Sequence, residues 1–294
     1  MEKRKYAGTW TAIVTPFKND GSLDEGAFRG LVKRQIDAGI TGIVPAGTTG
    51  ESPTLSLAEM KRIYEIAVEE AKGKAMVMAG TGSNSTAHAL EYTKAAIEAG
   101  ADCCLVVTPY YNKPTPNGLK AHFRAIADLG LPVVIYNIKG RTALNIETDT
   151  MMELAEHPNI VGVKEASGDI EQIRDVITRR PDDFTVLGGD DNMTFRLMEA
   201  GGDGVVSVAS NIVPEKIVQM VNYALDGNFE EAGKIDSELQ EMFAKIFVET
   251  NPVPVKYCLY KMGLCELAYR LPMCEPTQKS KEVLDEMISK YDLI

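Results

Sequence analysis

The sequence predicts a single (β/α)8 barrel, the TIM-barrel class of α/β protein, with additional C-terminal helices. Short β-branched runs alternate with longer amphipathic stretches across most of the chain, which is typical of repeated βα units around a parallel sheet. Eight such runs occur, and their cores are apolar without strict alternation, as expected of strands that are covered on both faces. The length of 294 residues is near the usual size of one barrel of this kind.

The predicted strands follow one another along the chain at residues 9–15, 41–46, 75–80, 103–108, 133–137, 160–165, 184–188 and 204–209. Helical patterns lie between them. In the one that follows Ser56, Glu59 completes a capping box, and Leu57, Met60 and Ile63 begin an apolar face. After the eighth run, four more stretches have a helical period, at residues 214–225, 229–248, 255–262 and 276–291. We expect a barrel over residues 1–224 and a helical extension over 225–294, packed against it.

The main rival within the α/β class is a doubly wound sheet. That fold commonly carries a GxGxxG fingerprint after its first strand, and nucleotide-binding versions carry GxxxxGK[ST]. Neither pattern occurs in the chain, so the barrel is the better prediction.

Composition excludes several classes of protein. The apolar fraction of 45% is ordinary, and no apolar run approaches the roughly 18 residues that a membrane span needs. A net charge of −11 argues against nucleic acid and anionic lipid as partners. The five cysteines form no CxxC pair, and the three histidines have no metal-binding spacing. We therefore expect a cytoplasmic protein with free thiols, no metal and no organic cofactor.

Polar residues gather where the predicted strands end, and barrel enzymes build their active sites at this face. Lys164 ends the sixth strand. Taken alone, such a lysine is more often a solvated or ion-paired charge. If burial leaves it partly neutral near pH 7, it can attack a ketone and form a Schiff base.

The neighbouring strand ends supply hydroxyl groups. Tyr136 ends the fifth strand and would lie beside Lys164, where a phenol can move protons if it is within hydrogen-bond reach of the reacting atoms. Thr48 and Tyr111 could extend that relay. Tyr110 and Tyr111 cannot both point into one mouth from an extended segment, so one of them is expected to face a neighbouring subunit.

Two further features would suit an anionic substrate. The Gly-Thr-Thr-Gly turn at residues 47–50 offers backbone N–H groups and hydroxyls to a small carboxylate. Arg141 lies in the predicted loop after the fifth strand. It could hold a second carboxylate through a bidentate pair, although a surface salt bridge is its commoner use.

Taken together, six segments resemble the dihydrodipicolinate synthase / N-acetylneuraminate lyase family, and its synthase branch in particular. They lie in the same order and at barrel spacing, and the resemblance spans essentially the whole chain. The segments are 47–52 (GTTGES), 108–112 (TPYYN), 136–142 (YNIKGRT), 163–168 (VKEASG), 204–207 (GVVS) and 249–256 (ETNPVPVK).

The resemblance implies an enzyme that condenses pyruvate, held as a Schiff base, with L-aspartate 4-semialdehyde in diaminopimelate and lysine biosynthesis. It assigns the imine to Lys164 and proton transfer to Tyr136, with Thr48 and a Tyr111 donated by an adjacent subunit completing the relay. This implies a dimer, usually paired into a homotetramer. The resemblance gives the remaining site residues as Thr49 and the backbone of Val206 for pyruvate, Arg141 for the carboxylate of the aldehyde, and Gly189 near the site.

Two departures from the family pattern lead to predictions. Lys139 replaces the usual proline beside Arg141, which removes a φ constraint and adds a charge, so the second-substrate loop is expected to be looser. In lysine-regulated members, lysine binds near Ser52, Asn84 and Tyr110. His88 replaces the glutamate that would grip its ammonium group, and Leu57 and Met60 replace histidines; we therefore expect weak or absent lysine inhibition.

Two other functions stay open at this point. A related pyruvate aldolase acting on a keto-deoxy sugar acid would keep Lys164 and Tyr136 and change the second-substrate loop, and Arg141 favours the synthase over it. A non-catalytic barrel that binds a small carboxylate would not need Lys164, Tyr136 and Thr48 together.

Overall fold

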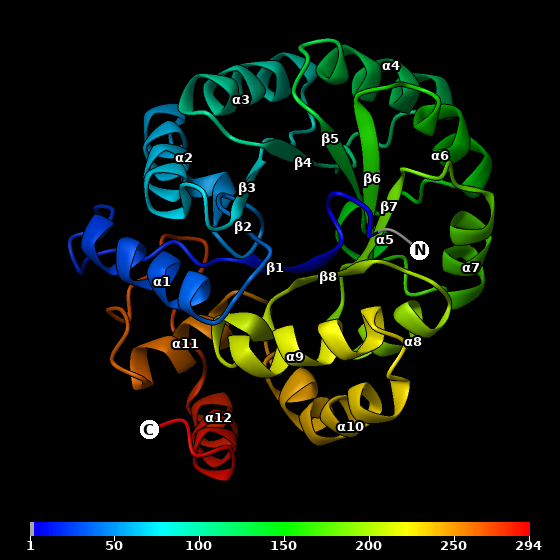
Figure 1. Cartoon of the computed structure of the whole chain (residues 1–294). Coiled ribbons are helices and arrows are strands. Elements are labelled where there is room, and N and C mark those ends of the chain that lie inside the picture. Colours follow the sequence, from blue (N-terminus) through cyan, green and yellow to red (C-terminus); the bar gives the residue numbers. More distant parts are fainter. Residues whose placement is uncertain (1–2) are drawn as a thin grey trace.

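The computed structural model describes residues 3–294, and a closed barrel of eight parallel strands forms its centre (Figure 1). The strands are β1 (Gly8–Ala12), β2 (Gly42–Val44), β3 (Met76–Gly80), β4 (Cys103–Val107), β5 (Val133–Asn137), β6 (Ile160–Glu165), β7 (Thr185–Gly188) and β8 (Gly204–Ser207). Strand β1 pairs with both β2 and β8, which closes the barrel. Each strand overlaps its predicted run, so the predicted fold class is confirmed.

A ring of helices surrounds the strands (Figure 1). It consists of α1 (Glu25–Asp37), α2 (Leu57–Ala71), α3 (Thr86–Ala99), α4 (Pro116–Ala127), α6 (Thr148–Ala155), α7 (Ile170–Arg179), α8 (Thr194–Glu199) and α9 (Pro214–Leu225). The predicted capping box opens α2, because the Ser56 amide donates to the Glu59 carboxylate at 2.9 Å and the Ser56 hydroxyl accepts from the Glu59 amide. Short 3-10 turns are η1 (Ser52–Thr54), η2 (Asp191–Met193) and η3 (Ala209–Asn211).

Three helices form the C-terminal extension: α10 (Phe229–Lys245), α11 (Val253–Lys261) and α12 (Gln278–Lys290). They lie outside the ring, on the side of α9 and α1 (Figure 1). Helix α9 packs against β1 and β8 and so completes the eighth βα unit, whereas α10 packs on α8 and α9. The helical periods after the eighth strand therefore cover one barrel helix and three additional ones.

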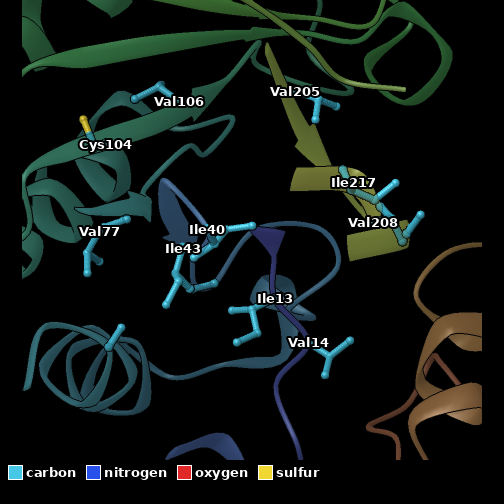
Figure 2. Close-up of a cluster of buried hydrophobic side chains, with 14 of the residues drawn as sticks. Ile13, Val14, Ile40, Ile43, Val77, Cys104, Val106, Val205, Val208 and Ile217 are labelled. Carbon is cyan, nitrogen blue, oxygen red and sulfur yellow. The ribbon is translucent and has the colours of Figure 1, made fainter. Parts of the chain in front are cut away.

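The core has two layers because alternate strand residues point to opposite sides. An outer layer fills the space between strands and helices; Figure 2 shows part of it, with Val77 and Val106 from β3 and β4. An inner layer fills the barrel itself and includes Trp10, Val134 and Tyr136. Buried strands with two apolar faces explain why the predicted runs lacked polar alternation.

Arg141 does not lie in an open loop, as the sequence had suggested, but in the one-turn helix α5 (Lys139–Thr142). The carbonyl of Ile138 accepts from the amides of Arg141 and Thr142 at 3.2 and 3.1 Å, and from the Thr142 hydroxyl at 2.9 Å. Ala143 ends the turn in the left-handed region, at φ 56°. A helix of four residues is too short to show periodicity in sequence.

Within residues 3–294, no helix combines the length and apolar character needed to cross a bilayer. All five cysteines are free, as predicted.

Candidate active site

Strand register brings Lys164 into the barrel. In the β5–β6 pair, Lys164 is aligned with Tyr136, and aligned residues of parallel strands point to the same side of the sheet. Because Tyr136 belongs to the inner layer, Lys164 also points inward, and it is only 5% exposed. Its Nζ lies 4.0 Å from the centroid of the Tyr136 ring. The two predicted catalytic residues are therefore adjacent.

Gly189 leaves room for the lysine. A Cβ at this position would lie 2.7 Å from the Cβ of Ala166 and 3.1 Å from Cε of Lys164, both too close for ordinary contact. The Gly189 amide donates to the carbonyl of Glu165 at 2.8 Å, so the chain after β7 is held directly against the lysine stem. Glycine is thus needed here for the close approach of the chain to the lysine stem.

Burial sets the protonation of both groups. Loss of solvation lowers the pKa of Lys164 to about 8, although the negative charges of Asp190 and Asp191 oppose the shift. Burial, with Asp190 as a smaller cause, raises the pKa of Tyr136 above its ordinary value. At pH 7 about one tenth of the lysine is then a neutral amine, whereas an unperturbed lysine would be neutral in roughly one molecule in three thousand. The phenol stays protonated.

A cavity of about 210 Å³ opens at this end of the barrel, and six of the eight predicted site residues line it. They are Thr48, Thr49, Tyr136, Arg141, Lys164 and Gly189. This volume is small, so the cavity suits compact metabolites. Within residues 3–294, no group of three or more His, Cys, Asp or Glu side chains is placed to hold a metal ion.

Asn251 connects the two predicted carboxylate-binding residues. Its side-chain Nδ2 donates to the hydroxyl of Thr49 at 3.0 Å, and its backbone carbonyl accepts from the guanidinium of Arg141 at 3.1 Å. The residue is 5% exposed and lines the cavity, and its Oδ1 has no hydrogen-bond partner within residues 3–294. The extension thus contributes a side chain to the mouth of the barrel.

A buried ion pair fixes the turn that carries the two threonines. Lys256 of α11 donates to the Glu51 carboxylate at 2.5 Å, and both side chains are at most 1% exposed. The other Glu51 oxygen accepts from the Arg270 amide at 3.2 Å, and the Lys256 ammonium lies 4.2 Å from the centroid of the Phe17 ring. Both residues belong to segments that carry the family resemblance, 47–52 and 249–256, but the sequence gave no indication that their charges form an ion pair.

Two predicted site residues lie outside the cavity. Val206 is fully buried in the inner layer, and Val208 lines the cavity at the end of β8 instead. Tyr111 is 90% exposed and has a φ of 74°, a strained region for a tyrosine. Within residues 3–294, the Tyr136 hydroxyl forms no hydrogen bond with Thr48 or Tyr111, so the predicted relay is not assembled within one chain.

A second cavity, of about 340 Å³, lies beside the first and shares Thr48 and Arg141 with it. This cavity is lined by five of the positions that the resemblance places around the lysine-binding site of regulated family members. They are Ser52, Met60, Asn84, His88 and Tyr110. Leu57 is 44% exposed and does not line it.

Asp190 is the main residue for which the sequence predicted no role. It follows β7 and lines the first cavity beside Lys164, whereas the next residue, Asp191, turns into the protein. Asp191 accepts hydrogen bonds from the Ser207 hydroxyl at 2.5 Å and from the amides of Val208 and Ala209 at 3.0 and 2.9 Å. The position of Asp190 at the end of a strand did indicate a site residue, but the sequence could not distinguish it from the adjacent Asp191.

Comparison with known proteins gives consistent matches over the whole chain. Residues 5–291 match the dihydrodipicolinate synthetase family. A Methanospirillum hungatei protein named 4-hydroxy-tetrahydrodipicolinate synthase is 47% identical, with 98% of this chain and all of that one aligned. The dihydrodipicolinate synthase structure from Aquifex aeolicus has a TM-score of 0.96 at 42% identity and covers 98% of this chain and 99% of its own. The Acinetobacter baumannii enzyme, solved in complex with pyruvate, has a TM-score of 0.96 at 39% identity, over 98% of this chain and 100% of that one.

Proposed function

This chain belongs to the dihydrodipicolinate synthetase family, and we propose that it joins pyruvate to L-aspartate 4-semialdehyde through an imine on Lys164. Its activity is that of a 4-hydroxy-tetrahydrodipicolinate synthase, a Schiff-base-forming lyase of diaminopimelate and lysine biosynthesis. The observation that carries the assignment to Lys164 is its position, buried against the Tyr136 ring with a pKa lowered to about 8.

In the first half-reaction, the neutral Lys164 amine attacks the keto carbon of pyruvate to form a carbinolamine. The carbinolamine takes up a proton and loses water to become a protonated imine, which withdraws electrons from the adjacent methyl group. A proton then leaves that methyl group, and the electron pair forms an enamine. Tyr136 is protonated at neutral pH and lies beside the nitrogen, so it suits proton transfer to and from these intermediates.

In the second half-reaction, the enamine carbon attacks the aldehyde carbon of the semialdehyde, and the new alkoxide takes a proton. The amino group of the semialdehyde loses a proton and attacks the imine carbon, which closes the ring. The ring nitrogen then gives up a proton and forms a C=N bond as the bond from that carbon to the Lys164 nitrogen, which has taken up a proton, breaks. The neutral amine is thereby regenerated. No cofactor is required, because each electron pair comes from a substrate or from the lysine.

The two carboxylates occupy different parts of the cavity in this proposal. Thr49 and the backbone of Val206, two residues before the cavity-lining Val208, hold the carboxylate of pyruvate, and Arg141 holds that of the semialdehyde. The Asn251 bridge supports this division because it fixes the Thr49 hydroxyl and the Arg141 guanidinium relative to one another. Thr48 adds a hydroxyl to the same wall.

We propose that the active assembly is a homotetramer, a dimer of dimers, in which Tyr111 enters the cavity of the adjacent subunit. Its 90% exposure and strained backbone support a function outside its own chain. The free cysteines support a reducing compartment, and we place the protein in the cytoplasm.

The test is borohydride reduction in the presence of pyruvate, followed by peptide mapping. We expect one pyruvyl adduct, on Lys164, which Lys164→Ala abolishes and which the control Lys139→Ala, on the exposed first residue of α5, retains. The trapped enzyme should lose its activity with L-aspartate 4-semialdehyde. An adduct elsewhere would refute the role of Lys164, and consumption of only a sugar-acid aldehyde would replace the second substrate.

A further inference from the structure

Asp190 is a free carboxylate in a cavity that already contains two cations. The charged side chains that line the cavity are Lys164, Arg141 and Asp190. Within residues 3–294, the carboxylate of Asp190 has no hydrogen bond or ion pair, and only its backbone carbonyl is used, by the hydroxyl of Thr194. The charges of Lys164 and Arg141 act on this carboxylate, but neither group donates a hydrogen bond to it, which leaves its oxygens available for a donor that arrives with the substrate.

We propose that Asp190 binds the α-ammonium group of the second substrate and thereby selects an amino-acid aldehyde over one that lacks the amino group. This inference rests on the proposed function, whose second substrate carries an ammonium and a carboxylate on one carbon. Arg141 binds the carboxylate, and Asp190 binds the ammonium.

The charge balance of the reaction supports this assignment. Before the semialdehyde reacts, Lys164 has become a neutral enamine, so the positive charge beside Asp190 has disappeared. Asp190 and Arg141 then remain as one negative and one positive group on the walls of the same cavity. An α-amino-acid head group has the matching pair of charges, whereas a sugar-acid aldehyde presents neutral hydroxyls.

A second unpaired acceptor comes from another residue that lines the same cavity. An ammonium group has three donors and is best bound by more than one acceptor. The Oδ1 atom of Asn251 is buried and without a partner in residues 3–294, and the backbone carbonyl of the same residue accepts from Arg141. In this proposal Asp190 supplies the charge, and the side chain of Asn251 supplies a neutral acceptor.

The test compares two aldehydes in the same enzyme: L-aspartate 4-semialdehyde and succinic semialdehyde, which has the same chain without the amino group. Asp190→Asn should raise KM for the amino aldehyde roughly 10- to 100-fold, as expected for neutralising one member of a partly buried charge pair. The inhibition constant of succinic semialdehyde should change less than about twofold. Asp190→Glu should recover part of the selectivity, because it retains the charge.

Asp183→Asn is the matched control. It makes the same chemical change on an exposed aspartate before β7, at the opposite end of that strand, and both kinetic constants should stay at wild-type values. Thermal unfolding by circular dichroism checks that each variant folds. Equal weakening of both aldehydes by Asp190→Asn, or no change with either, would overturn the proposal.

Pyruvate trapping distinguishes binding of the second substrate by Asp190 from an effect of Asp190 on the reactivity of Lys164. Asp190 raises the pKa of Lys164, so Asp190→Asn should keep the borohydride adduct and shift its pH dependence to lower pH. Loss of the adduct would mean that Asp190 acts on the lysine, which also overturns the proposal. Failure of the proposed function is recognised separately, because the wild-type enzyme itself would then trap pyruvate and leave L-aspartate 4-semialdehyde unconsumed.

Discussion

Replacing Lys256 with methionine should destabilise the protein by about 3–5 kcal/mol, because it leaves the Glu51 carboxylate buried without its counter-ion. The two side chains are at most 1% exposed and 2.5 Å apart, so water cannot take the place of the lost ammonium. The Arg270 amide at 3.2 Å is the remaining hydrogen-bond donor to that carboxylate, and the Arg270 guanidinium is paired with Glu59, so it does not replace the lost ammonium. Methionine keeps most of the volume, so the loss is mainly electrostatic.

The assay is urea unfolding followed by circular dichroism, at equal protein concentration. Glu51→Gln combined with Lys256→Met removes both charges and should recover at least half of the lost free energy of unfolding. Lys290→Met is the matched control. It breaks an exposed pair with Glu241 and should leave the urea midpoint at the wild-type value.

Two results would refute this reasoning. The first is a Lys256→Met variant within about 1 kcal/mol of wild type. The second is a double variant that is no more stable than the single one. Either would mean that the pair adds little beyond packing, and that the turn of Thr48 and Thr49 is held by other contacts.

Four further predictions concern the site itself. Pyruvate trapping should slow about tenfold for each pH unit below 8 and level off above it, because only the neutral Lys164 amine reacts; a flat profile between pH 6 and 8 would contradict this. Gly189→Ala should reduce the trapping rate at least tenfold, since its Cβ would press on Lys164 and Ala166; crystallography would show the displaced lysine. Lys139→Pro should leave pyruvate trapping unchanged, because proline suits the first residue of a helix. A large loss of the pyruvate adduct in this variant would contradict that expectation. With His88 in place of a glutamate, sub-millimolar lysine should not inhibit the condensation; inhibition in a coupled assay would show otherwise.

The fold was predictable because the strands of a parallel barrel are easy to recognise in sequence. The strands are buried on both sides, as in Val133–Asn137, so each one is a short β-branched run in the sequence between two helical stretches. Helix α5 was missed because four residues carry no period, and this placed Arg141 in a loop. Such short elements depend on local hydrogen bonds, here to the carbonyl of Ile138, which composition does not reveal.

The site was predictable to the extent that it lies at strand ends. Lys164 and Tyr136 follow from the barrel, because consecutive strands place the residues next to their C-terminal ends side by side. Asn251 could be flagged only as part of a motif, since its partners Thr49 and Arg141 are more than 100 residues away. Asp190 required the structure for a different reason. Its neighbour Asp191 has the same side chain, and only the direction of each carboxylate separates a structural residue from a free one.

The Glu51–Lys256 pair also bears on how the protein is made. The two residues are 205 positions apart, so during synthesis the turn that carries the threonines leaves the ribosome long before its counter-ion exists. An early barrel must keep the Glu51 carboxylate in water until the extension arrives. The mouth of the enzyme is therefore among the last parts to close, and a nascent chain stopped before residue 250 would hold all eight strands but no finished binding site.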